Sequence, residues 1–151
     1  MSGQKTTVIV RLILEKDTQI LFLKKTAQNG GGYSLVGGKV ESNESANKAI
    51  VRESLEEANI KIKRKHLRLV HIFKREFERE LILLYTAKKW EGKLESRELE
   101  KFKKVVWMKK KDLPKNISEV TRHLVGAYAQ KHFFSEEFIS WMEKGEEKKD
   151  S

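Results

Sequence analysis

The stretch GGKVESNESANKAIVRESLEEANI, residues 37–60, decides how the rest of the chain is interpreted. Its carboxylates Glu53, Glu56 and Glu57 lie three and four residues apart, so a helix places all of them on one face. Like charges at this spacing repel each other, and a bound cation would reverse that cost. Carboxylate oxygens suit Mg²⁺ or Mn²⁺, and a metal-bound water or a carboxylate base could attack phosphorus. The stretch therefore predicts a divalent-metal site on a helix.

The helix is expected to begin near Ser42 or Asn43, which are both good N-cap residues. It is expected to stop at Asn59, because asparagine tolerates the left-handed conformation that ends many helices. On a helical wheel, the three carboxylates share one arc with Ala46, Ala49 and Ile50, and the opposite arc carries Val51, Leu55 and Ala58. We therefore expect one face to be buried and the other to carry small residues and carboxylates.

Apolar patterning elsewhere predicts six strands, over residues 6–14, 20–23, 33–36, 67–74, 81–87 and 105–108. The second is expected to pair with the first across a turn at residues 15–19. The continuous apolar run at residues 81–87 is typical of a central strand. Residues 28–32 (QNGGG) form a flexible loop that could cover a substrate, and residues 89–100 form a polar loop.

The C-terminal part is expected to be helical. One apolar face is made by Val120, Leu124, Ala127 and Tyr128, and a second, shorter one by Phe134, Phe138, Trp141 and Met142. We expect these aromatic side chains to complete the core. Residues 1–144 are expected to form a single domain, and the charged residues 145–151 a disordered tail.

Composition narrows the class of protein. The chain of 151 residues contains no cysteine, which excludes disulfides, thiolate metal sites and thiol nucleophiles. No targeting or membrane-spanning segment is evident, so we expect a cytoplasmic protein. The net charge of +10 favours an anionic partner such as a nucleotide, a polyphosphate or an RNA end, or serves solubility alone.

Several kinds of active site are excluded by their motifs. The chain has no G-x-S-x-G elbow, no Walker A loop and no G-x-G-x-x-G turn. Its four histidines show no metal-ligand spacing, and we expect surface or packing roles for His66, His71, His123 and His132. The carboxylate helix remains as the candidate site.

This stretch resembles the Nudix box, G-x5-E-x7-R-E-U-x-E-E-x-G-U, in which U is a bulky aliphatic residue. The matching positions are Gly38, Glu44, Arg52, Glu53, Glu56, Glu57 and Ile60. Ser54 replaces an aliphatic residue, which should weaken packing of the helix, and Asn59 replaces a glycine whose conformation it can adopt. The Trp-Glu-Gly turn at residues 90–92 and the segment from Trp107 to Asp112-Leu113-Pro114 resemble the MutT-like branch.

The resemblance implies an α/β/α sandwich with a mixed β-sheet between helices and a catalytic loop-helix-loop. It also implies a Mg²⁺-dependent hydrolase, with Mn²⁺ as an alternative metal. Glu56 and Glu57 would bind the metal, Glu53 would be a further ligand or the general base, and a backbone carbonyl of Gly37 or Gly38 would complete the shell.

Other positions receive roles from the same resemblance. Arg52 would orient a neighbouring carboxylate, and Glu44 would lie near the metal or behind its ligands. A late loop would contribute Glu98, with Glu95 and Glu100 as rivals. Among substrate-binding residues, Lys25 would contact phosphate and Asn116 the base.

Four functions remain open. The first is a nucleoside triphosphate pyrophosphohydrolase that releases a monophosphate and pyrophosphate, with an oxidised purine dNTP as one possible substrate. The second is hydrolysis of ADP-ribose or a nucleotide sugar, which ranks lower because residues 75–77 lack the proline common in that branch. The third is trimming of RNA 5′ ends, and the fourth is a catalytically silent nucleotide-binding module. The sequence does not report an oligomeric state.

Overall fold

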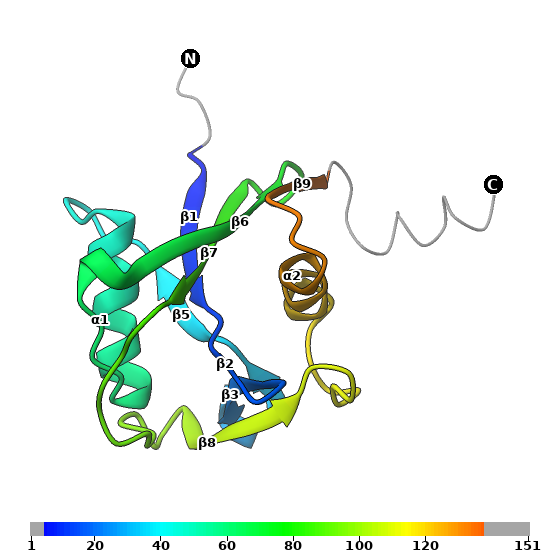
Figure 1. The fold of residues 1–151 in the computed structure, drawn as a ribbon. Helices are drawn as coiled ribbons and strands as arrows, with labels where there is room; N and C mark the ends of the chain where they lie inside the picture. Colours follow the sequence, from blue (N-terminus) through cyan, green and yellow to red (C-terminus); the bar gives the residue numbers. More distant parts are fainter. Residues whose placement is uncertain (1–4, 138–151) are drawn as a thin grey trace.

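The computed structural model describes residues 5–137, which contain two β-sheets and two α-helices (Figure 1). The helices are α1 (Ala46–Ala58) and α2 (Glu119–Ala129). The strands are β1 (Thr7–Leu12), β2 (Glu15–Lys16), β3 (Gln19–Lys25), β4 (Tyr33–Ser34), β5 (Val36–Lys39), β6 (Leu67–Arg75), β7 (Glu80–Ala87), β8 (Phe102–Lys109) and β9 (Phe134–Glu137). Short 3₁₀ turns occur at η1 (Ala27–Asn29) and η2 (Arg64–His66).

The larger sheet has five strands in the order β5-β1-β7-β6-β9. Strand β1 pairs with β7 in parallel and with β5 antiparallel, so the sheet is mixed, as the resemblance implied. Strand β7 lies at its centre, which confirms the prediction from the apolar run at residues 81–87. A β-bulge at Val70 shifts the register between β6 and β7.

The smaller sheet has four strands and is organised around β3. Strands β2 and β4 pair with β3, and β8 pairs with it over residues 19–25. The predicted pairing of residues 20–23 with a first strand at residues 6–14 holds only at the end of that stretch, where the N–H of Leu21 donates to the carbonyl oxygen of Leu14 at 3.1 Å. Asp17 and Thr18 both have positive φ and close a hairpin that contains only β2 and β3, while β1 stays in the other sheet. The predicted strand at residues 33–36 is likewise divided between the two sheets, as β4 and β5.

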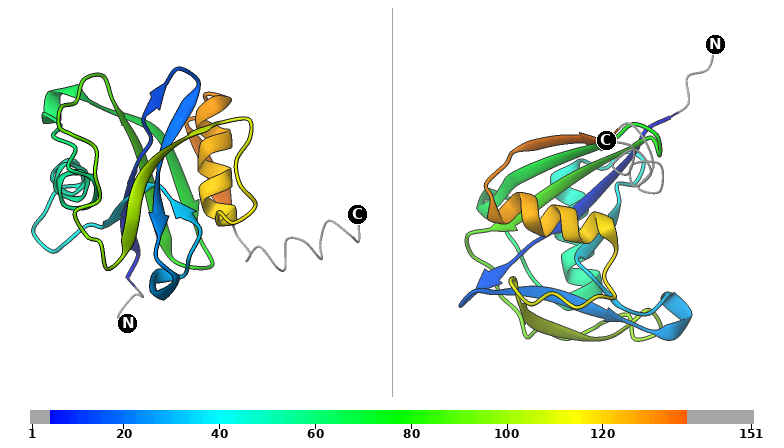
Figure 2. Two further views of the ribbon diagram at one scale, coloured as in Figure 1. Left: turned by 90° about the horizontal axis from the view of Figure 1, so that it is seen from below. Right: turned by 90° about the vertical axis from the view of Figure 1, so that its right-hand side faces the viewer.

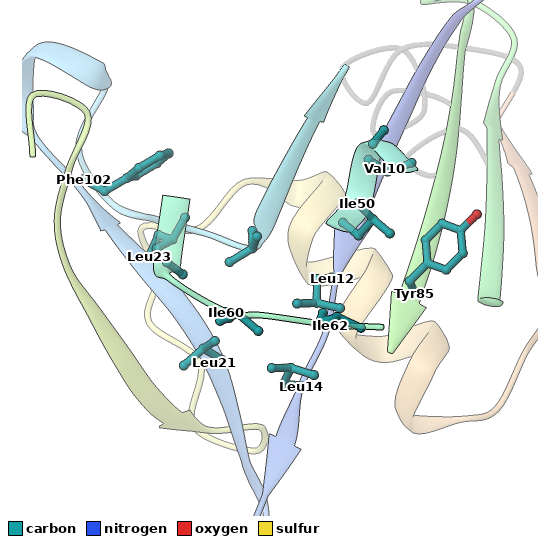
Figure 3. Close-up of a cluster of buried hydrophobic side chains, with 13 residues drawn as sticks. Val10, Leu12, Leu14, Leu21, Leu23, Ile50, Ile60, Ile62, Tyr85 and Phe102 are labelled. Carbon is teal, nitrogen blue, oxygen red and sulfur yellow. The ribbon is translucent and has the colours of Figure 1, made fainter. Parts of the chain in front are cut away.

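The two helices lie on opposite sides of the mixed sheet, as the predicted sandwich requires (Figures 1 and 2). Two buried clusters correspond to the two sides. Figure 3 shows the α1 cluster, in which Leu21 and Leu23 of β3 lie across from Leu12, the last residue of β1, and from Leu14, which follows that strand. The α2 cluster includes Phe22 of β3, Phe73 of β6 and Leu124 of α2. Each helix thus packs against strands of both sheets.

Helix α1 begins later than predicted. Its N-cap is Ser45, whose Oγ accepts a hydrogen bond from Lys48 N at 3.1 Å. Asn43 has a φ of 64°, outside the extended conformation of an N-cap, so the prediction of Ser42 or Asn43 is wrong. The C-terminal prediction is confirmed, because Asn59 caps the helix in the left-handed conformation with a φ of 58°.

The buried face of α1 also differs from the helical-wheel prediction. Leu55 is 37% exposed, whereas the buried residues are Ala49, Ile50, Ser54, Glu57 and Ala58. The face of α1 that packs on the sheet therefore includes one of the three carboxylates, that of Glu57. Ser54 is fully buried, and its hydroxyl donates to the carbonyl oxygen of Ile50 at 2.6 Å. Its polar group is satisfied inside the helix.

The C-terminal region contains one predicted helix, α2. The expected second helical face is wrong at Phe134, which begins strand β9 and pairs in parallel with Ile72 of β6. Phe138, Trp141, Met142 and the expected tail at residues 145–151 lie outside the described residues. Within residues 5–137, no helix is long and apolar enough to cross a membrane.

Histidine side chains join β9 to the rest of the fold. His71 is fully buried, with Nδ1 2.6 Å from the carbonyl oxygen of His132 and Nε2 2.8 Å from Oγ of Ser135. His123 Nε2 lies 2.8 Å from the same hydroxyl. His71 therefore has the packing role expected from the sequence.

Candidate active site

Gly37 and Gly38 belong to the edge strand β5 and allow α1 to approach its backbone closely. Gly37 has a φ of 146°, and a Cβ there would lie 2.0 Å from the carbonyl oxygen of Val10. A Cβ on Gly38 would lie 2.9 Å from the carboxyl carbon of Glu53. The backbone N–H of Gly37 donates to Glu57 Oε1 at 2.8 Å. The two glycines thus bring two α1 carboxylates directly against the strand.

Arg52 organises the other carboxylates of the stretch. It contacts both carboxylate oxygens of Glu44, with Nε–Oε2 at 2.7 Å and Nη2–Oε1 at 3.1 Å. Its Nη1 donates to Glu53 at 2.8 Å and to Glu56 at 3.2 Å. These charge-assisted bonds fix the guanidinium between residues of the loop and the helix. The hydrogen bond from Arg52 lowers the pKa of Glu44 to about 2, with a further contribution from the N–H of Glu41.

Glu57 is the most buried of the α1 carboxylates, with 6% of the residue exposed. Burial is the largest cause that raises its pKa to about 8, and the charges of Glu53 and Glu98 act in the same direction. The Gly37 N–H and the positive charge of Arg11 oppose this rise. A buried carboxylate beside other carboxylates is a favourable place for a cation, since a cation offsets both burial and repulsion.

Arg11 is a further residue of the candidate site and was not among the residues predicted from the sequence. Arg11 pairs with Gly37 across β1 and β5, and its Nη1 donates to the carbonyl oxygen of Leu35 at 3.4 Å. Burial lowers its pKa, and the nearby charges of Glu57, Glu53 and Glu80 act in the opposite direction. The available signal was the single charge in the apolar run at residues 8–14.

The late loop is attached to the C-terminal end of α1. The N–H of Arg97 donates to the carbonyl oxygen of Glu57 at 3.2 Å, and Asn59 Nδ2 donates to that of Lys93 at 2.9 Å. Glu98 has a half-buried side chain, 24% exposed, whose charge reaches Glu57. Glu95 and Glu100 are exposed. Glu98 is thus half-buried and its charge acts on Glu57, whereas its two rivals are exposed.

Lys25 lies at the end of β3, beside the glycine-rich loop. A Cβ on Gly30 would meet its Nζ at 3.6 Å. The loop is more ordered than predicted, because Thr26 caps the turn η1 and also donates to the carbonyl oxygen of Glu100 at 3.0 Å. Asn29 Nδ2 donates to that of Lys101 at 3.1 Å. Lys25 is therefore held close to the loop that carries Glu98.

Asn116 contacts the same glycine-rich loop through its backbone. Its carbonyl oxygen accepts from the N–H of Tyr33 at 3.2 Å and would lie 2.2 Å from a Cβ on Gly32. The residue is exposed, and its recorded contacts are with this loop rather than with the carboxylates. Its proposed contact with a base stays a prediction.

The donor set fits a hard divalent cation in its chemistry. Carboxylate oxygens of Glu53, Glu56 and Glu57, with Glu98 nearby, are the groups that Mg²⁺ and Mn²⁺ prefer. In residues 5–137, no group of three acidic or histidine side chains is gathered into a ready coordination shell. Arg52 Nη1 contacts one oxygen of Glu53 and one of Glu56, so the second oxygen of each carboxylate could bind a cation while these bonds remain.

Comparison with known proteins identifies the family. A family model described as NUDIX domain matches residues 3–128. A stretch of 58 residues is 41% identical to the CTP pyrophosphohydrolase of Escherichia coli (strain K12). It covers 37% of this chain and 43% of that protein, so the match spans less than half of the relative's length.

Solved structures share the fold over a longer stretch. The MutT NUDIX hydrolase from Burkholderia pseudomallei has a TM-score of 0.71 at 24% identity, over 82% of this chain and 98% of that one. The E. coli ORF135 protein has a TM-score of 0.67 at 28% identity, over 83% and 90% of the two chains. At 24% identity, the first of these likenesses concerns the fold alone.

Proposed function

Because this chain belongs to the Nudix hydrolase family, we propose that it is a Mg²⁺-dependent pyrophosphohydrolase of nucleoside triphosphates. The observation that carries the proposal is the position of Glu57. Its carboxylate is buried, accepts from the Gly37 N–H at 2.8 Å and lies in the electrostatic field of Glu53 and Glu98. A structural carboxylate in such a place would be costly, whereas a metal ligand gains from it.

The proposed roles follow the contacts. Glu56 and Glu57 hold the cation, with Glu98 and a backbone carbonyl of Gly37 or Gly38 as further oxygen donors. Mn²⁺ suits the same donors. When bound, the divalent ion polarises the phosphoanhydride and lowers the pKa of a water molecule.

Glu53 is proposed as the general base or as a further ligand. As base, it accepts a proton from the attacking water while a new P–O bond forms and the bridging P–O bond breaks. The products are a nucleoside monophosphate and pyrophosphate. Arg52 keeps Glu53 oriented through its 2.8 Å bond, and Glu44 in turn fixes Arg52 through both carboxylate oxygens. Both are positioning residues.

Substrate contacts are proposed for Lys25 and Asn116. Lys25 is a cation held near the Glu98 loop and suits a phosphate of the substrate. The name of the E. coli relative supports a nucleoside triphosphate, and CTP therefore joins oxidised purine dNTPs as a first substrate to test. ADP-ribose, nucleotide sugars and RNA 5′ ends are the alternatives, and a silent module that binds nucleotides without hydrolysing them is another.

A substrate panel tests the proposal. CTP, the canonical dNTPs, 8-oxo-dGTP, ADP-ribose, nucleotide sugars and 5′-triphosphate RNA are incubated with Mg²⁺ or Mn²⁺, and released pyrophosphate and monophosphate are measured. We expect a nucleoside triphosphate to have the highest kcat/KM. Absence of turnover on every compound, together with no metal binding by calorimetry, would contradict the proposal and favour the silent module.

Variants test the site assignment. Glu57→Gln is expected to reduce kcat by at least about 100-fold, because it removes a charged ligand of the proposed metal ion. Glu98→Gln is expected to lower activity more than Glu95→Gln or Glu100→Gln, which alter exposed acids in the same loop. Wild-type turnover of Glu57→Gln on the best substrate would show that the assignment of the site is wrong.

A further inference from the structure

The fold brings two lysine-rich segments, distant in the sequence, into one place. The first is residues 61–66, between α1 and β6, and the second is residues 88–91, after β7. Lys61 and Glu91 exchange backbone hydrogen bonds of 2.8 and 3.0 Å, and the N–H of Lys88 donates to the carbonyl oxygen of His66 at 2.9 Å. Both segments lie on the α1 side of the molecule (Figure 1). Their relative position is therefore set by backbone bonds rather than by the lysine side chains.

Together the segments line a cavity of about 510 Å³, called here the lysine cavity. Its charged lining consists of Lys61, Lys63, Lys65 and Lys89, with Glu91 as the acid. All four lysines are exposed. The lysines of residues 5–137 that have recorded carboxylate partners lie elsewhere, at Lys74, Lys101 and Lys110. The lysine cavity thus concentrates positive charge that the fold itself does not neutralise.

An aromatic ring and a histidine complete the lining. Trp90 is half-buried, with its ring centroid 6.4 Å from that of Trp107, so its position is fixed by the core beneath it. Desolvation lowers the pKa of His66, and the positive charges of Lys65, Lys89, Lys63 and Lys88 lower it further. The protonation of His66 therefore depends on the positive charge of these lysines.

We propose that the lysine cavity binds the phosphodiester backbone of single-stranded nucleic acid, with a base stacked on Trp90. Several cations around a concave surface with one fixed aromatic ring are the features that sequence-tolerant single-strand binding uses. The cavity shares no lining residue with the carboxylate site, so this binding is separate from the proposed hydrolysis.

The first test is a binding measurement with matched charge variants. Fluorescence anisotropy follows 12-mers of oligo(dT) and oligo(rU), which distinguish DNA from RNA, at several salt concentrations. The cavity variant K63E/K65E/K89E is compared with K103E/K109E/K111E, which makes the same change in net charge at exposed lysines outside the cavity. We expect at least a tenfold loss of affinity in the first and at most about a threefold loss in the second.

The salt dependence gives a second quantity. Each neutralised phosphate of a single strand contributes a slope of about −0.7 in log K against log salt. Loss of three lysine contacts should therefore make the slope less negative by about 2 in the cavity variant and leave it nearly unchanged in the control. Equal losses in both variants would show that the general charge of the protein, and not the cavity, binds the strand.

A site-specific measurement uses His66. NMR titration of its ring protons should show that oligo(dT) raises the pKa of His66, because phosphates offset the lysine charges. No binding by the wild type at 0.1 M salt, or binding of acidic phospholipid vesicles in place of oligonucleotides, would overturn the proposal. Nucleotide hydrolysis should be the same in both variants and the wild type, so the outcome is independent of the proposed function.

Discussion

The N–H of Gly37 donates to Glu57 Oε1 at 2.8 Å and joins strand β5 to helix α1 across 20 residues of sequence. This bond has both a structural and a chemical effect. It holds the helix against the edge of the mixed sheet, and it gives the buried carboxylate one fixed donor. The glycine is required at this point because the strand on its other side, β1, is too close for a side chain.

Gly37→Ala should therefore destabilise the protein severely. The added Cβ would lie 2.0 Å from the carbonyl oxygen of Val10, and alanine would also be strained at a φ of 146°. We expect the free energy of unfolding to fall by more than about 3 kcal/mol, as measured by urea denaturation.

Gly31→Ala is the matched control for Gly37→Ala. Gly31 has a φ of 67°, but a Cβ there would have no heavy atom within 4 Å. The free energy of unfolding of this control should fall by only about 1 kcal/mol, which is the cost of placing alanine in the left-handed conformation. Similar losses in the two variants would mean that the close approach of β1 to β5 contributes little.

Gly38→Ala should affect activity more than stability. A Cβ there would lie 2.9 Å from the carboxyl group of Glu53, which is the movable end of a side chain and can be displaced. We expect kcat to fall by at least about tenfold, with a change of less than about 1 kcal/mol in the free energy of unfolding. Unchanged kcat would show that the position of Glu53 is not critical.

Arg52→Lys should reveal the value of the guanidinium geometry. Arg52 contacts Glu44 through two nitrogens and also donates to Glu53 and Glu56, whereas an ammonium group cannot reproduce this planar pattern. We expect a loss of about 10- to 100-fold in kcat/KM, since such supporting residues orient the ligands. The exposed Arg68→Lys is the control, and equal activity of the two variants would contradict the positioning role.

Local signals in the sequence predicted the features that depend on neighbouring residues. The spacing of Glu53, Glu56 and Glu57, the cap at Asn59 and the central strand at residues 81–87 each depend on neighbouring residues or on a continuous apolar run. The structure agrees with the cap and the strand. It also places Glu98 within electrostatic range of Glu57.

Features that depend on distant partners were not predictable in the same way. Strand β3 pairs with β8, whose residues lie 77 to 90 positions later in the chain than their partners, rather than with its neighbour β1. Phe134 fits a helical spacing equally well, but hydrogen bonds to β6 place it in a strand. Arg11 lies beside the candidate site only because β1 pairs with β5 and sets Arg11 opposite Gly37. A local pattern does not specify which distant backbone will pair with it.

Ser54 tests the expectation that this departure from the family pattern weakens packing. The residue is fully buried, and its hydroxyl is satisfied by Ile50. Ser54→Ala should change the free energy of unfolding by less than about 1 kcal/mol. Alanine removes the buried hydroxyl together with its hydrogen bond, and it has a higher helix propensity than serine. Ser54→Leu should destabilise by about 1–3 kcal/mol through overpacking. A more stable leucine variant would show that serine does leave the interface loosely packed.

Glu15 should make stability depend on pH in a defined direction. Its carboxylate accepts from Lys110 Nζ at 2.7 Å and from the Tyr128 hydroxyl at 2.8 Å, joining β2 to the residue that follows β8 and to α2. The hydrogen bond from Lys110, and then that from Tyr128, lower its pKa from the usual 4.5. A lowered pKa in the folded state means that the stabilisation is present above pH 4.5 and is lost as pH falls through the folded-state value.

Glu15→Gln should therefore be less stable than the wild type at pH 7, by up to about 1 kcal/mol after solvent screening. The difference in Tm should shrink steadily below pH 4.5. Glu136→Gln, at an exposed position on β9, is the control and should show no such trend. A Tm difference for Glu15→Gln that stays constant from pH 7 to pH 3 would mean that the charge of Glu15 does not stabilise this junction.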